Sequence, residues 1–242
     1  MKITGVIPSR RNSQRFPNKP LADICGKPMI WWVYRNAINV KEFDAVYVAT
    51  DDEQIRAVCE KYNMNVIMTA NTHDSPTSRI FEVSQKVESD LYVFIGGDEP
   101  LVGSDAISQV IKAAVETGGS VTHAMTTIQS ASEVIDYANI KVVVNSDGYL
   151  LYTTRSPIPY PKGDLDFDYT KFVGVGAFTK EALDFYNKTP KSKLEIIENC
   201  DLIRFLDKGI PVKMVDVKCR NLSVDTPKDL TMVVSIIKNH GI

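Results

Sequence analysis

Three cations in one short segment, Pro8–Pro20, are the residues of this sequence best suited to chemistry. Arg10, Arg15 and Lys19 lie close together there, and no acidic residue occurs from Met1 to Ala22. Guanidinium groups bind phosphate oxygens in pairs, and an ammonium adds a mobile point charge. Because the 28 basic and 30 acidic side chains nearly balance, this local run indicates a small polyanion such as a triphosphate. A solvated basic loop is the alternative.

Two carboxylates complete a possible nucleotide site. Asp98 follows two glycines in Gly96–Pro100, and Asp225 precedes Thr226-Pro227. An Asp or Thr before Pro is also an ordinary helix N-cap, so Asp225 alone indicates little. Together with the cations and glycines, the two acids predict a magnesium-bound nucleoside triphosphate, with Asp98 and Asp225 as metal ligands. No G-x-G-x-x-G follows the first apolar run and no P-loop motif occurs, which argues against a dinucleotide site and a P-loop ATPase.

Composition excludes several other classes. The net charge of −2 gives no reason to expect a nucleic acid or a membrane as partner. The cysteines are too widely spaced for a zinc or redox motif, and the histidines are too scattered for a metal cluster. No apolar run reaches the length of a membrane helix or resembles a signal peptide. We expect a cytoplasmic protein with reduced thiols.

Short apolar runs alternate with helical patterns along the chain, which predicts an α/β fold, doubly wound, with a mostly parallel sheet and helices on both faces. Expected strands cover residues 3–7, 45–49, 65–68, 91–95, 121–127, 172–178 and 212–217. Expected helices cover residues 28–40, 52–62, 79–86, 105–116, 180–186, 194–206 and 227–238. Ligands bind beyond the carboxyl ends of such strands, so the basic loop and Asp98 are expected in one crevice.

The alternation of short apolar runs with helical patterns stops between residues 140 and 154. Two strand-like runs flank Asn145-Ser146-Asp147-Gly148, a turn-forming cluster typical of a hairpin. Residues 156–168, rich in proline and acids, predict an irregular loop. Since no linker or repeat is present, we expect one domain over residues 1–242, with a hairpin excursion at about 139–156.

Several motifs together resemble the 3-deoxy-manno-octulosonate cytidylyltransferases, or CMP-Kdo synthetases. They span the chain: PSRRNSQRFPNKPL, GKPMI, VATDDE, GGDEP, RSPIPYP and VDTPKDL. The resemblance implies one α/β domain with a protruding hairpin used in homodimerisation. It also implies magnesium-dependent transfer of CMP from CTP to the anomeric hydroxyl of Kdo or a related 3-deoxy-2-ulosonic acid. The products would be pyrophosphate and a CMP-sugar for lipopolysaccharide or other surface-glycan synthesis.

The resemblance also implies residue roles. Arg10, Arg15 and Lys19 would hold the triphosphate and serve catalysis, and Asp98 and Asp225 would bind Mg²⁺. The expected nucleotide-binding residues are Pro8, Ser9, Arg10, Ser75, Arg79 and Asp98. The expected sugar-binding residues are Gly96, Arg155, Phe172, Gly176, Glu198 and Asp201.

Departures from the family pattern concentrate where the sugar is expected. Gly96 occurs where the family has Gln, Phe172 where it has His, and Gly176 where it has an aromatic residue. Asp201-Leu202 occurs in place of Glu-Gln, and Pro76 in place of Gly. We therefore expect a smaller or more apolar sugar pocket and an acceptor other than standard Kdo, such as an amino- or acyl-substituted ulosonic acid. A nucleotide-sugar glycosyltransferase and a non-catalytic nucleotide-binding homologue are the alternative functions.

Overall fold

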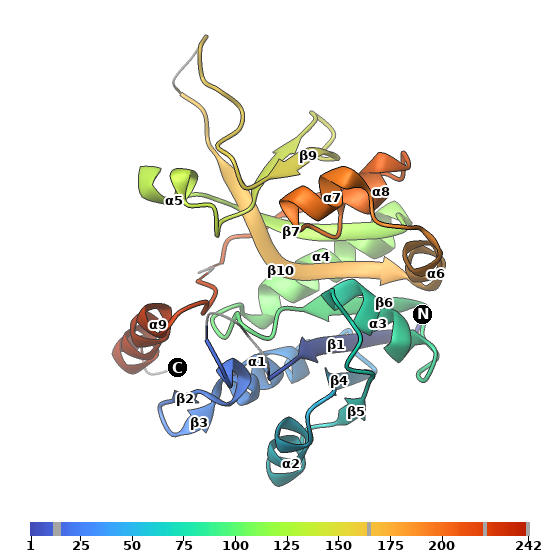
Figure 1. Ribbon diagram of the computed structural model, residues 1–242, viewed down its shortest axis with the longest axis vertical. Coiled ribbons are helices and arrows are strands. Elements are labelled where there is room, and N and C mark those ends of the chain that lie inside the picture. Colours follow the sequence, from blue (N-terminus) through green and yellow to red (C-terminus); the bar gives the residue numbers. More distant parts are fainter. Residues whose placement is uncertain (12–15, 164–165, 220–221, 241–242) are drawn as a thin grey trace.

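The structure, a computed structural model, describes residues 1–11, 16–163, 166–219 and 222–240. Its centre is a nine-stranded sheet in which seven strands follow the order β11-β7-β10-β6-β1-β4-β5 (Figure 1). These strands are β1 (Ile3–Ser9), β4 (Ala45–Thr50), β5 (Val66–Met68), β6 (Leu91–Ile95), β7 (Val121–Thr127), β10 (Thr170–Thr179) and β11 (Val212–Asp216). Pairings among β6, β1, β4 and β5, and between β7 and β11, are parallel, whereas β10 runs antiparallel to both neighbours. The predicted mostly parallel sheet is confirmed.

Helices cover both faces of this sheet. One apolar core joins it to α1 (Met29–Ile38), α2 (Glu53–Lys61) and α4 (Ser104–Thr117). A second core on the opposite face joins it to α3 (Pro76–Ser84), α6 (Lys180–Lys188) and α8 (Ile203–Asp207). The remaining elements are α5 (Ala131–Ile135), α7 (Lys193–Glu198), α9 (Pro227–His240), the 3-10 turn η1 (Lys19–Leu21) and the short strands β2 (Asp23–Ile24) and β3 (Lys27–Pro28). The doubly wound arrangement predicted from the sequence is thus confirmed.

The prediction of one continuous helix over residues 194–206 is wrong. Residues 194–206 form two helices, α7 and α8, because Asn199 adopts a left-handed backbone (φ 50°) that ends the first. Asn tolerates this conformation better than most residues, and the helical periodicity continues across the break. A buried ion pair between Arg204 and Glu195, with 2.5 Å between Nη2 and Oε1, holds the two helices together.

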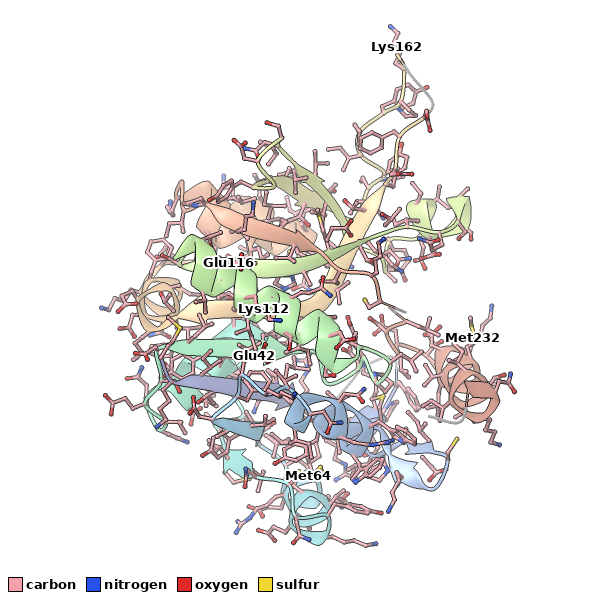
Figure 2. All side chains as sticks on the ribbon, turned by 180° about the vertical axis from the view of Figure 1, so that it is seen from behind. Glu42, Met64, Lys112, Glu116, Lys162 and Met232 are labelled. Atoms are coloured by element: carbon pink, nitrogen blue, oxygen red, sulfur yellow. The ribbon has the colours of Figure 1, made fainter. Side chains whose placement is uncertain are left out.

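The predicted hairpin forms from β8 (Lys141–Val144) and β9 (Leu150–Thr154), which are antiparallel. It extends the main sheet, because β8 pairs with the start of β10. The part of the molecule that projects furthest is instead the connection between β9 and β10, with Lys162 at its outer end (Figure 2). Within the described residues, no helix is long and apolar enough to cross a membrane.

The register of β1 against β6 creates the floor of the site. Val6 lies opposite Phe94, so the last residues of β1 meet the two glycines that follow β6. A Cβ atom on Gly97 would stand 2.9 Å from the carbonyl oxygen of Pro8, closer than real Cβ contacts. The glycine at position 97 therefore allows the end of β1 and the loop after β6 to approach one another.

Candidate active site

A cavity of about 600 Å³ opens at the carboxyl ends of β1 and β6. It reaches from the loops after these strands to the start of α3, the end of β9 and the end of α7. Its lining residues are Pro8, Ser9, Arg10, Lys19, Pro20, His73, Asp74, Ser75, Pro76, Phe94, Gly96, Gly97, Asp98, Tyr137, Arg155, Asn199 and Asp225. The crevice predicted to unite the basic loop with Asp98 is present.

The end of β1 offers polar groups to this cavity. The Ser9 hydroxyl oxygen is buried and has no hydrogen-bond partner within the described part of the chain. Burying such a group without a partner costs free energy, so the orphaned hydroxyl is suited to a polar ligand. Arg10 follows directly and lines the same space. Arg15, the third expected phosphate-binding cation, lies outside the described residues.

Lys19 lies between the two predicted metal ligands. Its Nζ is 2.7 Å from Asp98 Oδ2 and 3.3 Å from Asp225 Oδ1. Burial opposes the charged ammonium, but the two carboxylates outweigh it, so the pKa of Lys19 is raised. The backbone joins the acids as well, since the Val224 N–H donates to the Asp98 carbonyl at 2.8 Å. Residues distant in sequence thus form one compact charged group.

Glu99 is a residue of this site that the sequence analysis missed. It is buried, and its Oε1 accepts hydrogen bonds from the Gly174 N–H at 2.9 Å and from the Ser223 hydroxyl at 3.1 Å. Desolvation, with the charge of Asp98, raises the pKa of Glu99 to about 8. Because Ser223 and Gly174 belong to different segments, Glu99 joins the loop of Asp98 to β10 and to the segment before Asp225. Its place in the motif GGDEP was the one available signal.

The expected nucleotide residues near α3 divide into two groups. Ser75 lines the cavity, caps α3 by accepting from the Ser78 N–H at 3.1 Å, and bonds the Tyr186 hydroxyl at 3.0 Å. Arg79 does not line the cavity: it is buried, 3.1 Å from Asp51, and donates to Thr69. Desolvation lowers the pKa of Arg79. The structure therefore places Ser75 within reach of a ligand and Arg79 behind the wall.

His73, which the sequence analysis did not select, also lines the cavity. Its Nε2 lies 2.6 Å from Glu82 Oε2, and Lys86 contacts the other carboxylate oxygen at 2.7 Å. Although partial burial acts in the opposite direction, these hydrogen bonds lower the pKa of Glu82 to about 2. Glu82 therefore stays ionised and fixes the imidazole at the cavity wall.

Two of the expected sugar-binding residues, Gly96 and Arg155, line the cavity. Arg155 donates from Nε to the Glu198 carbonyl and from Nη1 to the Tyr137 carbonyl, each at 2.9 Å. Glu198 does not line the cavity. Its carboxylate accepts from the Arg155 N–H at 2.9 Å and from the Thr154 hydroxyl at 2.6 Å, so it supports Arg155 from behind.

The other three expected sugar-binding residues lie away from the lining. Asp201 is buried and accepts from the Thr77 N–H and hydroxyl, at 3.2 and 2.7 Å, and burial raises its pKa. Phe172 and Gly176 contact His123 of the neighbouring strand: a Cβ at Gly176 would be 2.5 Å from His123 Cδ2, and the Phe172 ring lies 4.7 Å from the imidazole. The space of the missing aromatic side chain at position 176 is therefore filled by His123.

Comparison with known proteins agrees with this geometry. A family model described as cytidylyltransferase matches residues 4–217. The chain belongs to the cytidylyltransferase family. It is therefore a nucleotidyltransferase, in agreement with the resemblance identified from its motifs.

Relatives within the family match over nearly the whole chain. The 3-deoxy-manno-octulosonate cytidylyltransferase of Escherichia coli is 36% identical, covering 98% of this chain and 96% of its own. The 8-amino-3,8-dideoxy-manno-octulosonate cytidylyltransferase of Shewanella baltica is 35% identical, covering 95% and 96%. A solved CMP:2-keto-3-deoxy-manno-octonic acid synthetase complexed with CTP superposes with a TM-score of 0.93 at 36% identity, covering 99% of this chain and 100% of its own.

The acidic residues of this cytidylyltransferase fit a magnesium ion. Asp98 and Asp225 provide hard carboxylate oxygens, and the Lys19 ammonium between them marks the place as one that accommodates positive charge. No group of three or more His, Cys, Asp or Glu side chains suited to a metal occurs among the described residues. Magnesium is commonly bound by one or two carboxylates, with substrate phosphates and water completing its shell. Two protein ligands are therefore sufficient.

Proposed function

We propose that this cytidylyltransferase transfers CMP from CTP to the anomeric hydroxyl of 3-deoxy-manno-octulosonate or a related 3-deoxy-2-ulosonic acid, releasing pyrophosphate. The observation that carries the proposal is the juxtaposition of Arg10, Lys19, Asp98 and Asp225 on one cavity. The names of the relatives, including one solved with CTP, support both substrates. The products would serve surface-glycan synthesis.

The side chains of this site act by position and charge. Displacement at phosphorus requires neutralised oxygens and a nucleophile in line with the leaving group. Arg10, Arg15 and Lys19 would neutralise the triphosphate, and the Ser9 hydroxyl would donate to a phosphate oxygen. The sugar hydroxyl oxygen bonds to the α-phosphorus while the bond to pyrophosphate breaks. No covalent enzyme intermediate is needed.

The carboxylates of Asp98 and Asp225 are suited to a magnesium ion. Asp98 and Asp225 would hold it, and it would supply a Lewis acid that neutralises phosphate charge and lowers the pKa of the attacking hydroxyl. Glu99 would hold Asp98 and Asp225 in fixed relative positions through its hydrogen bonds to Gly174 and Ser223. Lys19 would exchange its carboxylate contacts for the triphosphate as the ligands bind.

The acceptor acid is proposed to differ from standard Kdo. Phe172 and Gly176, two of the departures from the family pattern, pack with His123 in the layer behind Phe94 and do not line the cavity themselves. Burial lowers the pKa of His123 to about 4, so its imidazole stays neutral at pH 7. Gly96 on the lining, with this more apolar layer behind Phe94, favours a modified ulosonic acid, for example an amino- or acyl-substituted one.

Pyrophosphate release tests both substrates. The purified protein is given Mg²⁺, CTP and one acid at a time: Kdo, 8-amino-Kdo or a nonulosonic acid. Turnover with at least one acid is expected, with a modified acid preferred over Kdo. Equal or better turnover with Kdo contradicts the proposed specificity alone. Failure of all acids, together with no thermal stabilisation by magnesium and CTP, contradicts the function, because a ligand that binds only the folded state must raise the melting temperature.

Asp98→Asn tests the role of the carboxylate pair. Losing one group that stabilises charge at the reacting centre typically costs about 3–4 kcal/mol, so kcat/KM should fall roughly 100- to 1,000-fold. Arg11→Ala is the control, since Arg11 adjoins Arg10 but lies outside the lining of the cavity. It should retain most of the activity. Equal effects of the two substitutions would contradict the assignment.

A homodimer is proposed as the functional form. Leu151, Leu194, Ile196 and Ile197 are exposed on β9 and α7, which are neighbours in Figure 1. Several large apolar side chains left exposed on two adjoining elements are suited to a contact with a second copy of the chain. Their place beside the β8–β9 hairpin agrees with the dimerisation expected from the resemblance.

A further inference from the structure

Tyr137 is an aromatic residue on the cavity wall that the proposed chemistry leaves without a role. It follows α5, and its side chain is 68% exposed although it lines the cavity. A large ring that remains in water when the chain folds is available to a ligand. Arg155, directly after β9, and Asn199, directly after α7, line the same cavity.

The backbone around Tyr137 is held in place by cations from β8, from β10 and from the segment after β9. Arg155 Nη1 on the segment after β9 donates to the Tyr137 carbonyl at 2.9 Å. Lys141 of β8, fully buried, donates to the carbonyls of Asp136 and Asn139 at 2.9 and 2.6 Å. From β10, Lys171 forms an ion pair with Glu133 at 2.6 Å. Since the segment is already ordered, a ligand that contacts the ring loses little binding energy to ordering it.

Arg155, which donates to the Tyr137 backbone and lines the same cavity, is suited to bind a carboxylate. Nε and Nη1 of Arg155 are engaged by backbone carbonyls, and its Nη2 makes no hydrogen bond in the described part of the chain. Because Arg155 is a residue of the cavity lining, this nitrogen is a candidate donor to the carboxylate of a sugar acid. Because Arg155 also bonds the Tyr137 carbonyl, the position of the anion and the position of the ring are coupled.

Other parts of the lining are suited to the nucleotide. The end of β1 with Arg10 and Lys19 matches the triphosphate, and Asp98 and Asp225 match the metal. Ser75, one of the nucleotide-binding residues that the family resemblance implies, lies on another part of the lining. The wall of Tyr137, Arg155 and Asn199 is therefore left for the second substrate.

We propose that Tyr137 is a specificity-determining residue whose ring packs against the C–H face of the acceptor sugar acid. The inference rests on the proposed function and deepens it by naming how this chain selects the acceptor. The negative face of an aromatic ring attracts the partly positive hydrogens of a sugar, and the ring displaces water from the sugar's apolar side. The acid is held at two points, its carboxylate by Arg155 and its ring face by Tyr137.

The test compares Tyr137→Ala with two matched variants. Initial rates of pyrophosphate release are measured against the acceptor acid at saturating CTP, and against CTP at saturating acid. Loss of an aromatic contact should raise the KM for the acid about 5- to 10-fold and leave the KM for CTP unchanged. Tyr137→Phe, which keeps the ring and removes the hydroxyl, should behave like the wild type. Tyr160→Ala removes a more exposed tyrosine, 86% exposed, that does not line the cavity, and should change neither KM.

Direct titration of the acid into the protein by calorimetry separates this inference from the proposed function. Weaker binding of the acid by Tyr137→Ala, with unchanged binding by Tyr137→Phe, supports it. An unchanged KM for the acid in Tyr137→Ala overturns the inference and leaves the function standing. A loss in Tyr137→Phe equal to that in Tyr137→Ala also overturns it, because the hydroxyl would then be the group that matters. A wild type that neither turns over nor binds any acid overturns both.

Discussion

At the scale of single residues, Lys19 acts as the counter-ion of the site before substrates arrive. Its ammonium contacts both Asp98 and Asp225, so a divalent cation must displace it. Lys19→Met should therefore raise the affinity for Mn²⁺ in the absence of nucleotide, while weakening the binding of CTP. Titration of Mn²⁺ followed by electron paramagnetic resonance measures the first effect, and Lys112→Met on the surface of α4 is the control. Weaker Mn²⁺ binding in Lys19→Met would contradict this view.

His123 gives a second prediction at this scale, in the dependence of stability on pH. Burial lowers its pKa to about 4 in the folded protein, against 6.5 for the ordinary group. The unfolded chain therefore binds more protons between pH 6.5 and 4, and the contribution of this residue to stability falls as the pH falls through that window. The slope is at most about 1.4 kcal/mol per pH unit.

His123→Phe keeps a ring in place but cannot titrate. Urea unfolding from pH 4 to pH 7.5 should show a flatter loss of stability toward acid in this variant than in the wild type. The comparison is of slopes, so a uniform change in stability does not affect it. Parallel pH profiles would show that His123 is not buried in its neutral form.

At the scale of elements, β7 and β10 pack together through a large side chain on β7, His123, that lies over a glycine on β10, Gly176. Gly176 lies opposite His123, whose ring fills the space above it. Gly176→Ala should destabilise the protein by about 1–3 kcal/mol because the new Cβ overlaps that ring. In the double variant with His123→Ala the overlap disappears, so the two losses should not add. Denaturant unfolding gives the coupling energy.

Gly163→Ala is the matched control for this cycle, since Gly163 lies outside the helices and strands and a Cβ there meets no atom within 4 Å. It should change the free energy of unfolding by less than about 0.5 kcal/mol. Additive losses at Gly176 and His123 would show that the two strands accommodate the methyl group by other movements.

At the scale of the whole molecule, the exposed apolar surface of β9 and α7 predicts a dimer. Sedimentation velocity should give twice the mass of one chain, 27.0 kDa. Ile197→Glu, which places a charge on this surface, should shift the equilibrium toward the monomer. Ile38→Glu, on an exposed position of α1, should leave the dimer intact. A wild type that sediments as a monomer at micromolar concentration would contradict the proposal.

The sequence predicted most elements of the fold because their apolar periodicity is local. The bounds predicted for β1, β6 and α2 lie within a few residues of the bounds in the structure. The break between α7 and α8 was not foreseen, since it depends on the backbone of a single residue, Asn199, within a continuous apolar pattern. Register and neighbours across strands carry no such local signal.

By itself the sequence determined that Arg10, Lys19 and Asp98 meet on one cavity, because strand ends share one edge of a parallel sheet. Only the tertiary structure decided which of the further candidates face the cavity. It placed Arg155 on the lining but turned Glu198 and Asp201 into supports. It also revealed the positions of Glu99, His123 and Tyr137 in or near the site, because burial and contact depend on how segments distant in the chain pack together.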